Sequence, residues 1–152
     1  EKPACLYLPM LVNLEEEDVQ PNPPVAAPMS AITQKRKPNS NRDVEYDFNE
    51  NKVKLKIKDD LGKLLYHKHN LVTSAIKHEY YEISNNAPLS SMAQISWNFE
   101  YSRDNWMTRT ITETIMTSDE KYYYLKAKVR AYENEKNIFE KSFKHKIIRV
   151  NG

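Results

Sequence analysis

The sequence predicts an all-β protein, an antiparallel β-sandwich preceded by an extended N-terminal arm. Three observations support this prediction. Long segments in the last third alternate apolar and polar residues with a period of two, as strands with one buried face do. Short polar turns separate these segments, as in antiparallel hairpins. Seven of the eight prolines lie within residues 1–42, where they disfavour helix.

The arm is assigned to residues 1–42 and the sandwich to residues 43–152. Within the arm, Cys5–Leu14 is apolar enough to pack on a surface, and a disordered linker is the alternative. Proline lowers the conformational entropy that a segment loses when it becomes ordered. We therefore expect little regular structure in Pro21–Asn41 and apolar contacts for Leu6–Val12.

The first strands of the sandwich are expected after Asp43. In Lys52–Lys58, lysines alternate with apolar residues, which predicts a strand with one wet face. Such a row also suggests nucleic-acid binding, but the chain has 23 basic and 21 acidic residues, so we interpret it as an edge strand. Asp59–Lys63 is expected to be a turn at Gly62. Residues 72–83 are assigned to a strand, with helix as the alternative over Ser74–Tyr81.

The C-terminal half is predicted to be a four-stranded antiparallel meander. Turns are expected near Arg103–Asn105, Thr117–Glu120 and Asn134–Asn137. The strands between them are Met92–Ser102, Trp106–Met116, Tyr122–Tyr132 and Ile138–Ile148. The side chains expected in the core are Ile95, Trp97, Phe99, Leu125, Val129 and Phe143.

Composition narrows the function classes. A length of 152 residues fits one domain with its own core, and the net charge of +2 is not that of a dedicated nucleic-acid binder. No apolar run approaches the roughly 18 residues of a membrane span, and the first 15 residues lack a signal-peptide pattern. The single cysteine excludes an internal disulfide and permits a reduced compartment, so a cytoplasmic location is expected.

The sequence predicts no catalytic residues and no cofactor site. Only Gly62 and Gly152 are glycine, whereas a phosphate-binding loop needs several glycines and a nucleophile elbow needs glycines around its serine. One pair of histidines is close enough for a metal: His67 and His69 would share a face of a strand, with His78 or Glu79 as a third ligand. Histidines beside a lysine in a polar loop are more often solvated, so no metal site is predicted.

Six segments of the second half, in order and without a gap, resemble one family. In this sequence they are Asn86–Ser91, Asp104–Trp106, Thr117–Asp119, Ala131–Asn134, Ile138–Lys141 and Ile147–Arg149. The pattern resembles the C-terminal part of the CocE/NonD and X-prolyl dipeptidyl-peptidase serine hydrolases. Asn134 stands where that family has glycine, Asn105 where it has aspartate and Ile148 where it has proline. Asparagine readily adopts the turn conformation of glycine.

The resemblance implies a specific fold and role. In such hydrolases the catalytic serine, aspartate and histidine lie in a preceding α/β-hydrolase domain, which would be the partner of this chain. The C-terminal domain is a non-catalytic, jelly-roll β-sandwich with a galactose-binding-like fold that packs on the hydrolase domain and shapes the active-site region. The parent protein would be an acyl esterase or an X-Pro dipeptidyl-peptidase, and this chain alone would not be catalytic.

A stand-alone carbohydrate- or ligand-binding module of the same fold is the alternative. Such modules stack sugars on exposed aromatic rings. The candidates for ligand stacking are Trp106, Tyr122, Tyr124 and Tyr132. Self-association of the isolated domain is a further option, because a neighbouring copy could take the place of the hydrolase domain.

Overall fold

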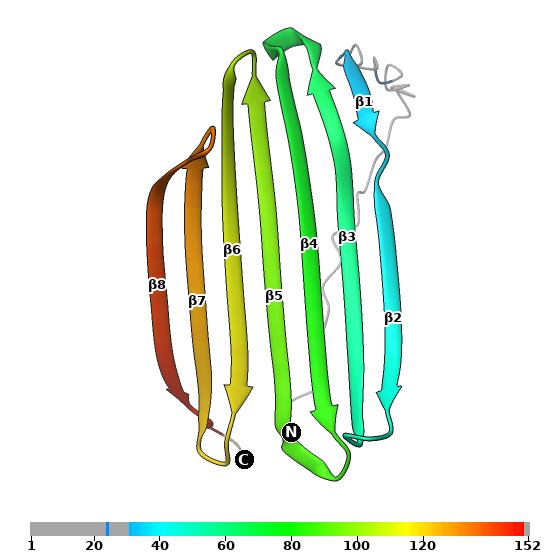
Figure 1. Cartoon of the computed structure of the whole chain (residues 1–152), viewed down its shortest axis with the longest axis vertical. Helices are drawn as coiled ribbons and strands as arrows, with labels where there is room; N and C mark the ends of the chain where they lie inside the picture. Colours follow the sequence, from blue (N-terminus) through cyan, green and yellow to red (C-terminus); the bar gives the residue numbers. More distant parts are fainter. Residues whose placement is uncertain (1–23, 25–30, 151–152) are drawn as a thin grey trace, which may run out of the picture.

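The structure, a computed structural model, describes Pro24 and residues 31–150. It is built from strands, with one 3-10 turn (Figure 1). The elements are β1 (Ile32–Arg36), β2 (Asn39–Asp47), β3 (Lys52–Tyr66), η1 (His67–His69), β4 (Leu71–Ser84), β5 (Ala87–Arg103), β6 (Trp106–Ser118), β7 (Tyr122–Glu133) and β8 (Lys136–Ile148).

All eight strands belong to one antiparallel sheet with the order β1-β3-β4-β5-β6-β7-β8, and β2 also pairs with β3 (Figure 1). Lys52–Asp60 of β3 pairs with β2 and Lys63–Tyr66 pairs with β1, so these two strands follow one another along the same edge. The all-β, antiparallel fold class is confirmed. From β2 to β8 every strand lies beside its successor in the chain, and the jelly-roll, galactose-binding-like topology stays a prediction.

The predicted meander is confirmed, with β5 to β8 covering its four strands. Asparagine or aspartate occupies the tight turns, since these residues tolerate positive φ better than other non-glycine residues. Asn134 has φ 51°, as expected from its place in the turn, and its side-chain oxygen accepts a hydrogen bond from the Met107 amide at 3.0 Å. The residues with positive φ at or beside the tight turns are Asn51, Asn70, Asn86, Asp104 and Asn134.

The prediction of a turn at Asp59–Lys63 is wrong. Strand β3 continues through it, and the register against β4 shifts between Asp60 and Lys63, which is a β-bulge. Gly62 supplies the bulge with φ 84°, and its amide donates to Asp60 Oδ1 at 2.8 Å. A glycine in a strand pattern can mark a turn or a bulge. Here β4 pairs with β3 on both sides of Gly62, so the glycine marks a bulge.

Two further predictions need correction. The sheet begins at Ile32, before the expected start at Asp43, so β1 and part of β2 come from the segment assigned to the arm. The strand carrying the four lysines, β3, is not an edge strand, because β1 and β2 cover one side of it and β4 the other. The arm contacts predicted for Leu6–Val12 lie outside the described residues.

The predicted core residues share one face of the sheet, but none of them is buried. Within residues 31–150, only Gly62 and Ser74 are buried. A single sheet protects each side chain only by its neighbours on the same face, so large residues stay half-buried without a second layer. The side chains assigned to the core that are half-buried are Ile95, Trp97, Phe99, Leu125, Val129 and Phe143.

Candidate functional site

The pairing register separates the sheet into an apolar face and a polar face. Residues directly opposite each other on neighbouring strands point to the same face, and alternate residues along a strand point to opposite faces. Leu55 lies opposite Tyr81, Tyr81 opposite Ala93, and Ala93 opposite Met116. Met116 lies opposite Leu125, so one face is apolar across five strands.

Large aromatic side chains form a ridge on the apolar face of β5. Trp97 and Phe99 stack with ring centroids 5.0 Å apart and an interplanar angle of 10°, and Tyr101 continues the row with 44% of its surface exposed. The strands beside this ridge carry small residues on the same face, so the surface falls away from β5 towards β6 and β7. These residues are Thr108, Thr110, Thr112, Thr114, Ala127, Val129 and Ala131.

Trp106 extends this ridge at the hairpin between β5 and β6. It lies opposite Arg103, in register with the apolar face, and is 41% exposed. Its indole N–H donates to Glu133 Oε1 at 3.1 Å, which fixes the ring at the sheet end. We call Trp97, Phe99, Tyr101 and Trp106 the aromatic ridge. Trp97 and Phe99 of this ridge are half-buried, and Tyr101 and Trp106 are exposed. A partly exposed apolar row is typical of a surface that another part of a protein covers.

One charged group on the apolar face is neutralised locally. Lys77 lies opposite Trp97, with its ammonium 5.6 Å from the ring centroid. It pairs with Glu79 and, at 3.0 Å, with Asp59. The hydrogen bonds to Glu79 and Asp59 raise the pKa of Lys77 above its ordinary value and lower the pKa of both carboxyl groups. The ion pairs therefore let the lysine stem cover the tryptophan without a free charge on this face.

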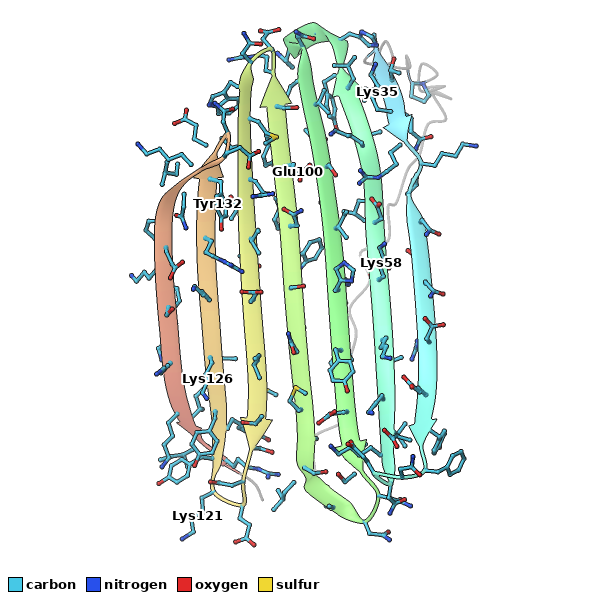
Figure 2. The ribbon with its side chains drawn as sticks, viewed as in Figure 1. Lys35, Lys58, Glu100, Lys121, Lys126 and Tyr132 are labelled. Atoms are coloured by element: carbon cyan, nitrogen blue, oxygen red, sulfur yellow. The ribbon has the colours of Figure 1, made fainter. Side chains whose placement is uncertain are left out.

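The polar face carries paired charges on β3. Lys54 bonds Asp47 at 2.7 Å and Lys56 bonds Glu45 at 2.6 Å, both across to β2. The bond to Asp47 raises the pKa of Lys54, and the bonds from Lys54 and from the Glu50 amide lower the pKa of Asp47. Two lysines of the row are thus paired with carboxylates on the neighbouring strand. Figure 2 labels Lys58, which belongs to the same row.

The four residues predicted to stack ligands do not form one platform. Trp106 lies on the apolar face, whereas the three tyrosines lie on the polar face at opposite ends of β7. Tyr132 lies at the end far from Lys121, as Figure 2 shows, and Arg109 covers its ring at 4.7 Å.

Tyr122 and Tyr124 remain together at the other end of β7. Their ring centroids are 6.3 Å apart, and the Lys146 ammonium lies 3.7 Å from the Tyr122 centroid. The Tyr124 hydroxyl donates to Asp119 Oδ2 at 2.6 Å, and the amides of Lys121 and Tyr122 donate to Asp119 Oδ1. These bonds hold the pKa of Asp119 below its usual value, and the bond to Asp119 raises the pKa of Tyr124.

The histidine pair lies in a 3-10 turn and not on a strand. His67 Nε2 lies 2.6 Å from Thr33 Oγ1, so this ring is tied to β1. Of the two residues considered as a third ligand, His78 lies opposite Lys58 on the polar face and Glu79 lies opposite Ile57 on the apolar face. In the part of the chain that the structure describes, no group of three or more metal-ligating side chains is found.

A polar cluster at the bulge was not predicted. Arg36 donates to Asp60 Oδ1 at 2.7 Å and to Ser74 Oγ at 3.0 Å, which joins β1, β3 and β4. The guanidinium lowers the pKa of Asp60, and Ser74 is the only buried polar residue among those described. The sequence signal was Asp60 two positions before Gly62, but the partner on β1 depends on long-range pairing.

Comparison with models of protein families, with curated proteins and with solved structures found no match. No helix in residues 31–150 is long and apolar enough to cross a membrane.

Proposed function

We propose that this chain is the non-catalytic C-terminal accessory domain of a serine hydrolase, of the acyl esterase or X-prolyl dipeptidyl-peptidase type. In this proposal the domain packs on an α/β-hydrolase domain and helps to shape its active-site region. The family resemblance of the turn and strand-end motifs from Asn86 to Arg149 supports the identity of the parent protein. The aromatic ridge is the observation that carries the proposal, since a half-buried apolar row on one face of a sheet is typical of a surface that another domain covers.

The ridge suits a covering domain because of its shape. Trp97 and Phe99 are held parallel, so they present one rigid edge, and the low surface beside them on β6 and β7 can receive side chains of the partner. Rigid aromatic side chains at the centre of an interface commonly supply much of its binding energy. The polar face carries ion pairs such as Lys54–Asp47 and Lys56–Glu45, which is consistent with a surface that faces solvent.

The coding sequence that precedes Glu1 tests the identity of the parent protein. The proposal expects an α/β-hydrolase domain with a serine on a glycine-flanked elbow. A parent gene without such a domain would refute it. The isolated chain should not hydrolyse p-nitrophenyl esters or X-Pro amides above background. Saturable turnover that one Ser→Ala change in this chain abolishes would also overturn the accessory role.

The ridge is tested in the full-length parent protein by limited proteolysis. Replacing Trp97 or Phe99 with alanine should speed the release of the C-terminal domain, because its packing on the hydrolase domain is weakened. Ser96→Ala is the matched control, since it changes a neighbour of Trp97 on the polar face. Equal release from the Trp97→Ala, Phe99→Ala and Ser96→Ala proteins would contradict the docking role.

The alternative function, carbohydrate or ligand binding, depends on Tyr122 and Tyr124. A hollow of about 320 Å³ lies beside them, lined also by Asp119, Glu120 and Lys121. However, Lys146 covers the Tyr122 ring, and a sugar would have to displace it. Saturable quenching of tyrosine fluorescence by a monosaccharide, lost in Tyr122→Ala, would favour this alternative over the accessory role.

A further inference from the structure

A second apolar feature lies on the same face, at the end of the sheet away from η1. It is a groove of about 440 Å³ that crosses β3 to β7, and we call it the cross-strand groove. Its lining includes Val53, Leu55, Tyr81, Ile83, Ala93 and Met116. Ile83 and Met116 remain 39% and 43% exposed, so the groove is open to an apolar occupant.

We propose that the N-terminal segment Cys5–Leu14 of the same chain binds in the cross-strand groove, with residues 15–31 as its spacer. This segment lies outside the described residues. Its sequence is mostly apolar, and the acidic run Glu15–Asp18 follows it directly. Burial in the groove should end at Leu14, because the carboxylates of the acidic run that follows are costly to remove from water. The inference goes beyond the proposed function and does not depend on it.

The length of the chain fits this occupant. The chain joins the sheet at Ile32, opposite Tyr66 of β3. Along the strand direction, the groove lies at the level of Leu55 of β3. These two positions of β3 are 11 residues apart, or about 37 Å at about 3.4 Å per residue. The middle of the groove lies on β5, three strand spacings from β1, or about 14 Å, which gives a straight distance of about 40 Å.

The spacer can bridge this distance. Residues 15–31 are 17 residues long and include Pro21, Pro23, Pro24 and Pro28. A polyproline-like segment rises about 3.1 Å per residue, so the spacer can extend to about 53 Å. The excess allows the chain to turn back from the start of β1 over the apolar face. A shorter or glycine-rich spacer would fit this task less well.

Tethering favours the chain's own segment over a second copy. A segment linked by a short spacer has an effective concentration in the millimolar range at its site, far above that of another molecule in dilute solution. The prolines further reduce the entropy lost on binding. The residues of β5 that line the groove are Ser91, Met92 and Ala93. Trp97 lies four residues beyond Ala93 on the same strand, so the aromatic ridge stays available.

The experiment uses Cys5, the only cysteine of the chain. Ala93→Cys places a second thiol in the groove, and Gln94→Cys is the matched control on the polar face of the same strand. Each variant is oxidised with glutathione disulfide in dilute solution, which takes up the two electrons of the thiols. The products are then separated on non-reducing gels and located by peptide mass mapping.

We expect Ala93→Cys to form an intramolecular disulfide with Cys5 about tenfold or more faster than Gln94→Cys, because only the first thiol lies where the tether concentrates Cys5. Ser91→Cys repeats the test at a second groove position, in case Ala93→Cys perturbs folding. Leu8→Asp in the Ala93→Cys protein should remove the difference. Equal rates in the two variants, or disulfides mainly between chains, would overturn the inference, and the latter would assign the groove to a second copy.

Discussion

The substitution Gly62→Ala tests the bulge that shapes β3. Gly62 has φ 84°, and a Cβ at this position would lie 2.6 Å from the carbonyl oxygen of Arg36. Alanine in a left-handed conformation costs about 1–2 kcal/mol. Overpacking against an atom that must move typically costs about 1–3 kcal/mol more, and here the atom belongs to the backbone. We therefore expect the free energy of unfolding to fall by about 2–5 kcal/mol.

Urea unfolding followed by circular dichroism measures this loss. Asn51→Ala is the matched control, because Asn51 also has a positive φ, 52°, but lies in a hairpin turn. It should lose only the conformational part, about 1–2 kcal/mol. If Gly62→Ala lost no more than Asn51→Ala, the close approach of β1 to the bulge would be wrong.

Two further predictions concern polar groups. Arg36→Ala removes the guanidinium that donates to Asp60 and to the buried Ser74 hydroxyl, and it should cost about 1–2 kcal/mol in urea unfolding. Lys35→Ala, which changes the neighbour labelled in Figure 2, should cost about 0–0.5 kcal/mol, and equal losses would contradict the cluster. The folded-state pKa of Asp119 is lowered, so its contribution is present above the unfolded pKa of about 3.9 and is lost as the pH falls through the folded pKa. The urea concentration at the unfolding midpoint should therefore fall less between pH 6 and pH 3 for Asp119→Asn than for the wild type. Identical decreases would mean that the hydrogen bonds to Asp119 do not favour its ionised form.

The strands of the C-terminal half were predictable because their alternation is local. Residues in Met92–Ser102 change face at each step, and neither glycine nor proline interrupts them. The bulge was not predictable, since Asp59–Lys63 reads equally well as a turn until its pairing with β1 and β4 is known. The start of the sheet at Ile32 also depends on long-range pairing with Tyr66.

The candidate site was predicted in part, for a similar reason. Alternation correctly placed Trp97 and Phe99 on one face, but it did not reveal that no second layer covers them within the described residues. The stacking residues were chosen as exposed aromatics, and the face of each depends on its register. Trp106 falls on the opposite face from Tyr132 because of the offset across the β6–β7 hairpin.

The size of this face of the sheet can be compared with the two coverings proposed above. Seven strand positions span about 30 Å across the sheet, and strands of about 13 residues span about 45 Å, so the face covers about 1,300 Å². A ten-residue segment such as Cys5–Leu14 extends over about 33 Å and occupies about 10 Å in width, which covers about 300 Å². About 1,000 Å² then remains around the aromatic ridge. This area matches the roughly 800 Å² that each partner buries in a stable, specific interface. The proposed N-terminal segment is therefore too small to cover this face alone, and the area that remains is large enough for the proposed folded partner.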